Sequence, residues 1–279
     1  MIMMFNNMKL IPLICGCKFL VTLILIFSSN LVFADNIELA TGINTDPPFV
    51  YGDFDISSEY PGITIDVLNL IEKKTNFKFN IGKRPWARVV RDVKTNVLDG
   101  GFHFSFKEER LSFVAYPILK GEHTPDPSYS ISDRSYILYR LKDESIRWNG
   151  ERIISDSNKP VIIGAIRGSS VTGTINQLGY TLLEANTDKQ LLKLLLFKRV
   201  DAIVGLENML DAKVETLALE EQIIIKKTYP PIETKPYYIA FSKAFYNKQP
   251  EAAWKIWDTI KLIKSSGEMT EIFKRYVDR

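Results

Sequence analysis

Strand-like and helix-like segments alternate from residue 37 onward, and this alternation limits the chain to few folds. "IELATGIN", "FKFNIG" and "GGFHFSF" have the composition of strands. Between them, "GITIDVLNLIEKKTN" carries apolar residues at positions 63, 67, 68, 70 and 71, the spacing of a helix buried along one face, and "WARVVRDVKTNVL" is also helical. This βαβαβ order predicts a largely parallel sheet covered by helices.

A second series of the same kind begins at "PVIIGAI" and continues through "SSVTGTINQLG", "YTLLEA", "TDKQLLKLLLFKR" and "VDAIVGL". Two βαβαβ series in one chain of 279 residues predict two α/β lobes. We therefore expect an α/β protein in which each lobe is built on its own parallel sheet.

Two further segments are expected to connect these lobes. Residues 121–159 contain the strand "SYILYRL" between polar ends, and "YPPIETKPYYIAFSKAF" has a similar character. We expect lobe 1 to comprise residues 35–124 and 233–279, and lobe 2 to comprise residues 125–232. The final segment, "EAAWKIWDTIKLIKSSGEMTEIFKRYV", is predicted to form helices docked on lobe 1, with Gly267 as a cap or turn.

The N-terminal residues 1–34 are predicted to be a secretory signal. The apolar run "FLVTLILIF" is followed by Val32 and Ala34, small residues suited to cleavage after Ala34. A retained membrane anchor is the alternative, but the run is shorter than the roughly 20 residues that span a bilayer. Lipid modification of Cys17 is a second alternative, although the main apolar run follows this cysteine. The predicted location of the mature protein is periplasmic.

The mature chain would contain no cysteine, because Cys15 and Cys17 both lie in the predicted signal. A disulfide framework, a thiol nucleophile and a zinc–cysteine site are then excluded. Removal of Lys9 and Lys18 leaves a net charge of +1, so no nucleic-acid partner is expected. The two histidines lack metal-ligand spacing, so we expect no metal. We also expect no cofactor, and we expect the protein to be a monomer.

Several motifs, in order and spacing, resemble the bacterial extracellular solute-binding proteins of family 3, the polar amino-acid-binding type. They are "PPFVY", "GITIDVL", "VLDGGFHFSFKEER" followed by "VAYP", "IGAIRGSSV", "RVDAIVG" and "LIKSSGEMTEIFKRYV". The resemblance implies a type II periplasmic-binding-protein-like fold, with two lobes joined by two crossing strands that close on a small solute. It also implies a membrane permease of an ABC-type importer as partner, or alternatively a membrane receptor.

Arg110 is the first candidate ligand contact. It follows a predicted strand end, where α/β sheets form binding crevices, and a guanidinium can grip a carboxylate with two parallel hydrogen bonds. The alternative is a surface arginine paired with Glu108 or Glu109. Ser105 matches the family position of a hydroxyl that also contacts the ligand carboxylate, although it could be only a polar strand residue.

The second lobe supplies candidates in "RGSSVTG". Gly168, Ser169 and Ser170 stand at a predicted helix start, where free N–H groups could meet an anion, and a serine there could also act only as a cap. Trp86 begins a helix where the family often places a wall for the ligand, and its ring could stack on the ligand or pack in the core.

Departures from the family pattern concern the ligand's ammonium group. Leu206 stands where amino-acid-binding members usually have an aspartate, and Glu207 beside it cannot be assumed to replace that acid. Lys107 replaces a common threonine. These changes predict a small polar ligand with a carboxylate or another anionic group and no requirement for an α-ammonium. Catalysis is the competing class, since some proteins of this fold are dehydratases and Lys107 and Glu207 could supply acid–base chemistry.

Overall fold

The computed structural model describes residues 36–43, 46–52, 60–156 and 159–277. The chain divides into residues 1–34 and residues 35–279, and only the second unit is described below. The predicted secretory signal therefore lies outside the described residues. Within the described part, no helix has the length and apolar character needed to cross a membrane.

The first βαβαβ series forms as predicted. It comprises β1 (Asn36–Gly42), α2 (Ile63–Lys74), β2 (Lys78–Arg84), α3 (Trp86–Lys94) and β3 (Gly100–Ser105). Strand β1 lies in the middle, parallel to β2 on one side and to β3 on the other. Helices α2 and α3 bury one face each, which the apolar spacing in the sequence already indicated.

The second series repeats this arrangement. It comprises β8 (Ile162–Ile166), α4 (Val171–Gln177), β9 (Thr181–Ala185), α5 (Asp188–Leu196) and β10 (Ala202–Leu206). Strand β8 is central and pairs in parallel with β9 and β10. Both series thus place their first strand between the second and the third, which creates a topological switch point in each half.

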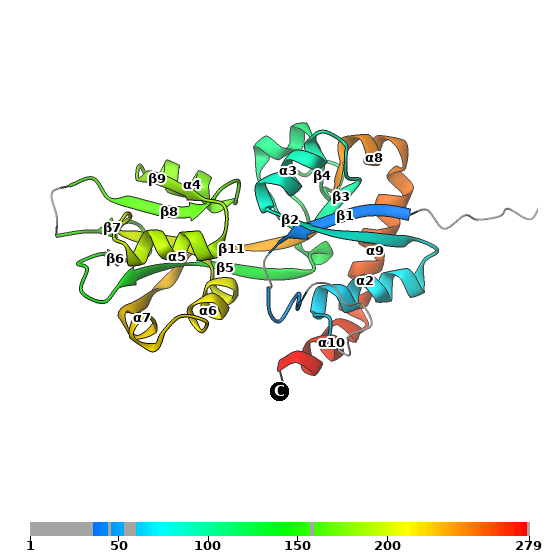
Figure 1. Cartoon of the computed structure of the whole chain (residues 1–279). Coiled ribbons are helices and arrows are strands. Elements are labelled where there is room, and N and C mark those ends of the chain that lie inside the picture. Colours follow the sequence, from blue (N-terminus) through cyan, green and yellow to red (C-terminus); the bar gives the residue numbers. More distant parts are fainter. Residues whose placement is uncertain (1–35, 44–45, 53–59, 157–158, 278–279) are drawn as a thin grey trace, which may run out of the picture. The chain divides into compact units, whose positions relative to one another are not determined.

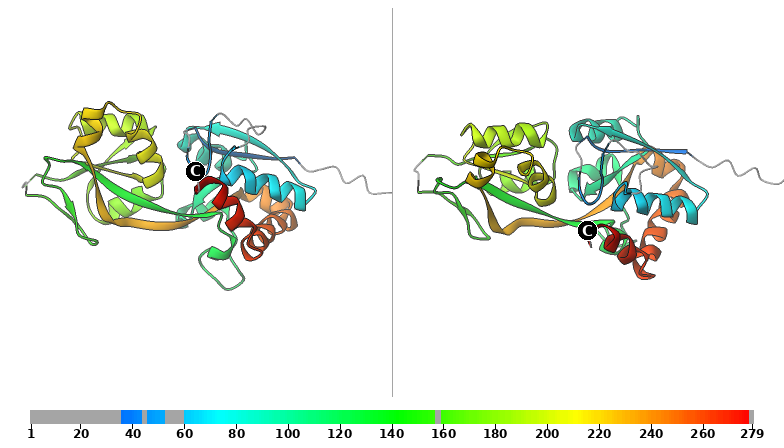
Figure 2. Two further views of the ribbon diagram at one scale, coloured as in Figure 1. Left: turned by 90° about the horizontal axis from the view of Figure 1, so that it is seen from below. Right: turned by 60° about the horizontal axis from the view of Figure 1, so that its bottom comes forward.

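Two strands connect the halves, β5 (Ser132–Leu141) and β11 (Ile225–Ser242). They pair with each other antiparallel; β5 also pairs with β10, and β11 with β3. The result is a 9-stranded mixed sheet with the order β2-β1-β3-β11-β5-β10-β8-β9 and with β4 paired to β11. Figures 1 and 2 show β5 and β11 running together between the two groups of helices and strands. The predicted two crossing strands are confirmed, and they join both parallel sets into one sheet.

The remaining elements extend this framework. Two 3-10 helices span Glu108–Ser112 and Pro127–Tyr129, and the other strands and helices are β4 (Val114–Ala115), β6 (Arg147–Trp148), β7 (Ile153–Ile154), α6 (Glu207–Val214), α7 (Leu219–Ile224), α8 (Lys243–Lys248), α9 (Pro250–Ser265) and α10 (Glu268–Val277). Strands β6 and β7 form a separate antiparallel pair.

The C-terminal helices belong to the core around β1. Ile256, Trp257 and Ile260 of α9 and Ile272 of α10 are buried in one cluster with β1 and α2. Gly267 separates the two helices with φ of 86°, a left-handed conformation that glycine adopts without strain. The predicted return of the chain and its turn at Gly267 are therefore observed. The domain boundaries at residues 124 and 232 stay a prediction.

Strand β3 needs its two glycines because it lies between β1 and β11. A Cβ atom at Gly100 would be 2.5 Å from the Ala240 carbonyl oxygen, and one at Gly101 would be 2.7 Å from the Ala40 carbonyl oxygen. No side chain fits at these distances without backbone movement. The glycine pair thereby allows β3 to enter the sheet and deliver Ser105 at its carboxyl end.

Candidate ligand-binding site

A cavity of about 90 Å³ lies at the carboxyl ends of parallel strands from both halves. This volume is several times the roughly 10–15 Å³ that a single buried water requires, so a small solute is the natural occupant. Strand ends of the first half contribute Thr41, Gly42, His103 and Ser105, and those of the second half contribute Ile166, Val204, Gly205 and Leu206. Carboxyl ends of parallel strands are where open α/β sheets bind ligands.

Four predicted contact residues line this cavity. They are Trp86, Ser105, Ser169 and Ser170. Each comes from the segment that follows or ends a strand, which is why local sequence patterns could find them. Leu206 also lines the cavity, so the position at which the family usually has an aspartate faces the cavity with an apolar side chain.

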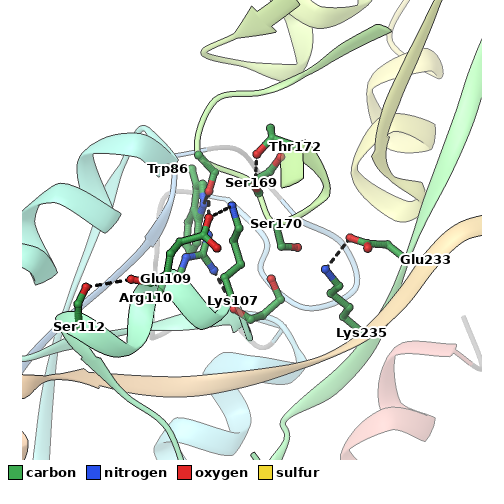
Figure 3. Close-up of polar contacts among 12 residues, drawn as sticks. Trp86, Lys107, Glu109, Arg110, Ser112, Ser169, Ser170, Thr172, Glu233 and Lys235 are labelled. Carbon is green, nitrogen blue, oxygen red and sulfur yellow. Dashed lines mark hydrogen bonds and ion pairs between the residues drawn. The ribbon is translucent and has the colours of Figure 1, made fainter. Parts of the chain in front are cut away.

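Arg110 lies beside this group but is not among the residues that line the cavity. It is 3% exposed. Its Nη1 donates to the Ser105 carbonyl oxygen at 2.7 Å, and its Nη2 donates to the Gly168 carbonyl oxygen at 2.8 Å (Figure 3). The guanidinium also lies 5.8 Å from the ring centroid of Trp86 and 5.5 Å from that of Phe104. Arg110 therefore joins the two halves through backbone carbonyls.

The Gly168 carbonyl oxygen is a shared acceptor. The indole Nε1 of Trp86 donates to it at 3.1 Å, in addition to Arg110. Gly168 itself has φ of 75°, which turns its carbonyl toward the first half at the start of the segment leading into α4. Gly168 accepts these hydrogen bonds from the opposite half and is not among the residues that line the cavity, and its contact with an anion through N–H stays a prediction.

Lys107 and Glu207 also lie outside the cavity lining. Lys107 Nζ is 2.8 Å from Glu109 Oε1 (Figure 3). The terminal atoms of Lys107 also lie against Gly173 of α4. Glu207 pairs with Lys227 at 2.9 Å and accepts from the Tyr229 hydroxyl. Because α6 begins at Glu207, the helical turn carries its side chain away from the direction of Leu206.

A polar cluster of residues far apart in the sequence lies at the cavity. Asp46 accepts from Arg134 Nη2 at 2.5 Å through Oδ2 and from Asn208 Nδ2 at 2.6 Å through Oδ1. Asn208 also donates to the Pro47 carbonyl oxygen at 2.8 Å. Asp46 belongs to a turn after β1, Arg134 to the crossing strand β5, and Asn208 to α6. This cluster is a second connection between the halves.

His103 contacts the same cluster from β3. Its φ is 65°, and the pairing of β3 with β11 shifts register between Tyr238 and Ala240, next to this residue. Its Nε2 is 2.8 Å from the Thr64 hydroxyl, and its Nδ1 is 3.3 Å from Asp46 Oδ2. Burial and the positive charge of Arg134 hold the pKa of His103 well below its ordinary value. The imidazole is therefore neutral at neutral pH.

Hydroxyl groups from both crossing strands complete the polar part of the wall. The Tyr237 hydroxyl donates to the Tyr136 hydroxyl at 2.8 Å, and Ser170 Oγ lies 3.4 Å from the same Tyr136 oxygen. Burial raises the pKa of both tyrosines, so they stay protonated and can donate. Asn186, just before α5, and Asp188, its first residue, also line the cavity.

The residues of this polar cluster carry only weak signals in the sequence. Asp46 stands just beyond the first strand. Arg134 is a single cation at the start of an apolar strand, and Asn208 is one of two polar residues in the first turn of α6. Their convergence depends on sheet order, which no local pattern contains.

Solved structures with the same architecture define the class of fold. The substrate-binding protein of an amino acid ABC transporter is 18% identical, with a TM-score of 0.66 over 88% of this chain and 100% of that one. The GluR0 ligand-binding core from Nostoc punctiforme, solved with L-glutamate, is 17% identical, with a TM-score of 0.62 over 87% and 100%. A histidine kinase sensor domain is 14% identical, with a TM-score of 0.67 over 88% and 96%. The fold is the two-lobed, type II periplasmic-binding-protein-like α/β fold.

The family follows from the sequence match. The model of the bacterial extracellular solute-binding proteins, family 3, matches residues 39–279, and the chain belongs to this family. No curated protein matches the chain. The predicted family membership is thus confirmed over nearly the whole of the described unit.

Proposed function

We propose that this protein captures a small, carboxylate-bearing solute in the cavity and delivers it to the membrane permease of an ABC-type importer. The observation that carries the proposal is the cavity itself, whose wall combines strand ends from both halves with buried hydrogen-bond donors. A solute held there contacts both halves at once, so binding favours the closed arrangement.

Enclosure strengthens the polar contacts of such a site. The wall buries Arg134, Ser105, Ser169 and Ser170, and hydrogen bonds to a charged group gain strength when water is excluded. Ile166, Val204, Leu206 and Met209 supply apolar surface for the rest of the solute. A few polar groups in a mainly apolar wall are typical of small-molecule sites.

The nature of Leu206 supports a ligand that does not need an α-ammonium group. The side chain lines the cavity and offers no acceptor at the position where family members usually have an aspartate. Of the predicted contacts, Trp86, Ser105, Ser169 and Ser170 are proposed as wall residues. Arg110 and Lys107 are proposed to add positive charge next to the wall.

A free amino acid is the second candidate ligand. Asp188 is buried and lines the cavity, so the wall carries a carboxylate as well as cations. The solved structures with this fold include an ancestral arginine-binding protein bound to glutamine. Comparing amino acids with their deaminated acids separates this candidate from the first.

We propose a periplasmic location after removal of residues 1–34, a monomer, and no nucleic-acid partner. Delivery to a receptor is the alternative to import, since the histidine kinase sensor domain shares the fold. Loss of solute uptake on deletion of the gene supports import, whereas unchanged uptake with a lost transcriptional response supports a sensor.

Turnover of the solute is not part of the proposal. One solved structure with this fold is an ancestral amino-acid-binding protein described as a precursor of a dehydratase. In the present chain, the acid–base candidates Lys107 and Glu207 pair with Glu109 and Lys227, outside the cavity lining. Recovery of the bound solute unchanged after long incubation supports binding alone, and conversion of the solute contradicts it.

A thermal-shift panel tests the proposal, because a ligand that binds only the folded state raises the melting temperature. The panel contains L-glutamate, L-glutamine and L-arginine, their deaminated acids glutarate, glutaramate and 5-guanidinovalerate, and the neutral glutaramide, glucose and spermidine. Shifts confined to carboxylates are expected. If only glucose, spermidine or glutaramide shifts the melting temperature, or if no compound does, the proposal of a carboxylate-bearing solute is contradicted.

A further inference from the structure

Two buried hydrogen-bond donors of the cavity wall have no acceptor within the described part of the chain. They are Nε of Arg134 and Oγ of Ser169. Arg134 is 4% exposed and Ser169 is 7% exposed, and both residues line the cavity. Arg134 stands on the crossing strand β5, whereas Ser169 precedes α4 in the second half.

A donor that is buried without an acceptor costs free energy, so native proteins leave few of them. The two donors here belong to one cavity, and one of them carries a positive charge. A carboxylate suits this pair of donors, because it can accept hydrogen bonds from both and can neutralise the positive charge of one of them. We propose that Arg134 and Ser169, which line the same cavity, bind the carboxylate of the solute. This inference rests on the proposed function and names the residues that carry it out.

The surroundings of Arg134 hold its guanidinium in place. Its Nη2 donates to Asp46 Oδ2 at 2.5 Å, and the Asp46 carboxylate is fixed in turn by Asn208. The guanidinium carbon lies 4.2 Å from the ring centroid of Phe49 and 5.4 Å from that of Tyr237. An arginine fixed in this way loses little further freedom when it binds a ligand.

Asp46 already balances the charge of Arg134, so the site needs a further source of positive potential to favour an anion. Arg110 provides it. The acceptors of Arg110 are the neutral carbonyls of Gly168 and of Ser105, a residue that lines the cavity. Arg110 thus favours an anion through its field while Arg134 makes the contact. Figure 3 shows Arg110 and Trp86 on the first half with Ser169 facing them from the second.

The test compares a carboxylate with its own primary amide. The probe is the carboxylate of the panel with the largest thermal shift, and Kd is measured for the acid and the amide by calorimetry. The protein is purified after export from cells that express the full chain. We expect the wild type to prefer the acid by about 10- to 100-fold, the range of a charged hydrogen bond.

Arg134→Lys keeps the cation for Asp46 but removes the Nε donor, and Ser169→Ala removes the hydroxyl. Each is expected to reduce the preference for the acid about tenfold. Arg110→Lys is expected to weaken the acid and the amide by a similar factor, which leaves the preference unchanged. Arg147→Lys, the same change at an exposed arginine, is the matched control.

Ser169→Ala also separates a ligand role from a structural one. Because its hydroxyl has no acceptor in the described part of the chain, the ligand-free melting temperature should stay the same or rise. If circular dichroism shows that Arg134→Lys is not folded, the effect of Ser169→Ala on the preference for the acid is the deciding result. A preference that survives in both variants, or that disappears only in Arg110→Lys, overturns this inference while the proposed function stands. A wild type that binds no carboxylate overturns both.

Discussion

Replacing Arg110 with lysine separates two roles that the sequence and the structure give to this residue. The resemblance to solute-binding proteins makes Arg110 a ligand contact, in which case the ligand-free protein should not depend on it. The structure shows two hydrogen bonds from its guanidinium to the carbonyls of Ser105 and Gly168. If these bonds stabilise the protein, Arg110→Lys lowers the free energy of unfolding even without ligand.

The expected loss follows from the geometry. Both bonds, at 2.7 and 2.8 Å, fall in the range of charged hydrogen bonds. An ammonium group can replace one of them but cannot reach two carbonyls as a planar fork does. One lost bond from a charged donor costs about 1.5–3 kcal/mol. The cation remains near the rings of Trp86 and Phe104, so we expect a loss of about 2 kcal/mol.

Urea unfolding without ligand, followed by both circular dichroism and tryptophan fluorescence, measures this loss. With an m value of about 3 kcal/mol/M, the midpoint should fall by roughly 0.7 M. The control Arg147→Lys should leave it unchanged, since exposed pairs contribute little. An unchanged midpoint in Arg110→Lys, together with a large loss of solute affinity, would refute the structural role and support the ligand contact.

Two further predictions concern the cavity. The pKa of His103 is depressed in the folded protein, so the unfolded chain binds the additional proton as pH falls through about 6.5. Stability should therefore be fully present above this pH and decrease between about pH 7 and 5.5, with a slope of up to about 1.4 kcal/mol per pH unit that His103→Asn removes in urea titrations. A slope that persists in His103→Asn would assign it to other groups. Leu206→Asp places a carboxylate in the wall, and the affinity for L-glutamate relative to glutarate should rise about tenfold by calorimetry. An unchanged ratio would show that position 206 does not meet the α-carbon substituent.

Much of the cavity wall was predictable because it follows strand ends in the sequence. Trp86, Ser105, Ser169 and Ser170 all stand shortly after or at the end of segments whose composition predicted strands. Carboxyl ends of parallel strands gather at one edge of a sheet, so their neighbours must lie near a crevice.

Direction of a side chain was less predictable than its location. Arg110 and Gly168 were both expected to contact the ligand, which stays a prediction, and the sequence did not indicate that they contact each other across the two halves. A long arginine side chain can point along several paths from the same backbone position, and packing against Trp86 and Phe104 selects one of them.

The sequence by itself determined the α/β class, the two parallel sets of strands and the segments that border the cavity, because each is encoded in the spacing of neighbouring residues. Only the tertiary structure decided that Asp46, Arg134 and Asn208 meet, since Arg134 lies 88 positions and Asn208 lies 162 positions from Asp46 in the sequence. Their contact depends on the order of strands in the sheet and on the path of β5 between the halves. Hydrophobic periodicity specifies which face of an element is buried, but the sheet order specifies which distant polar groups share that burial.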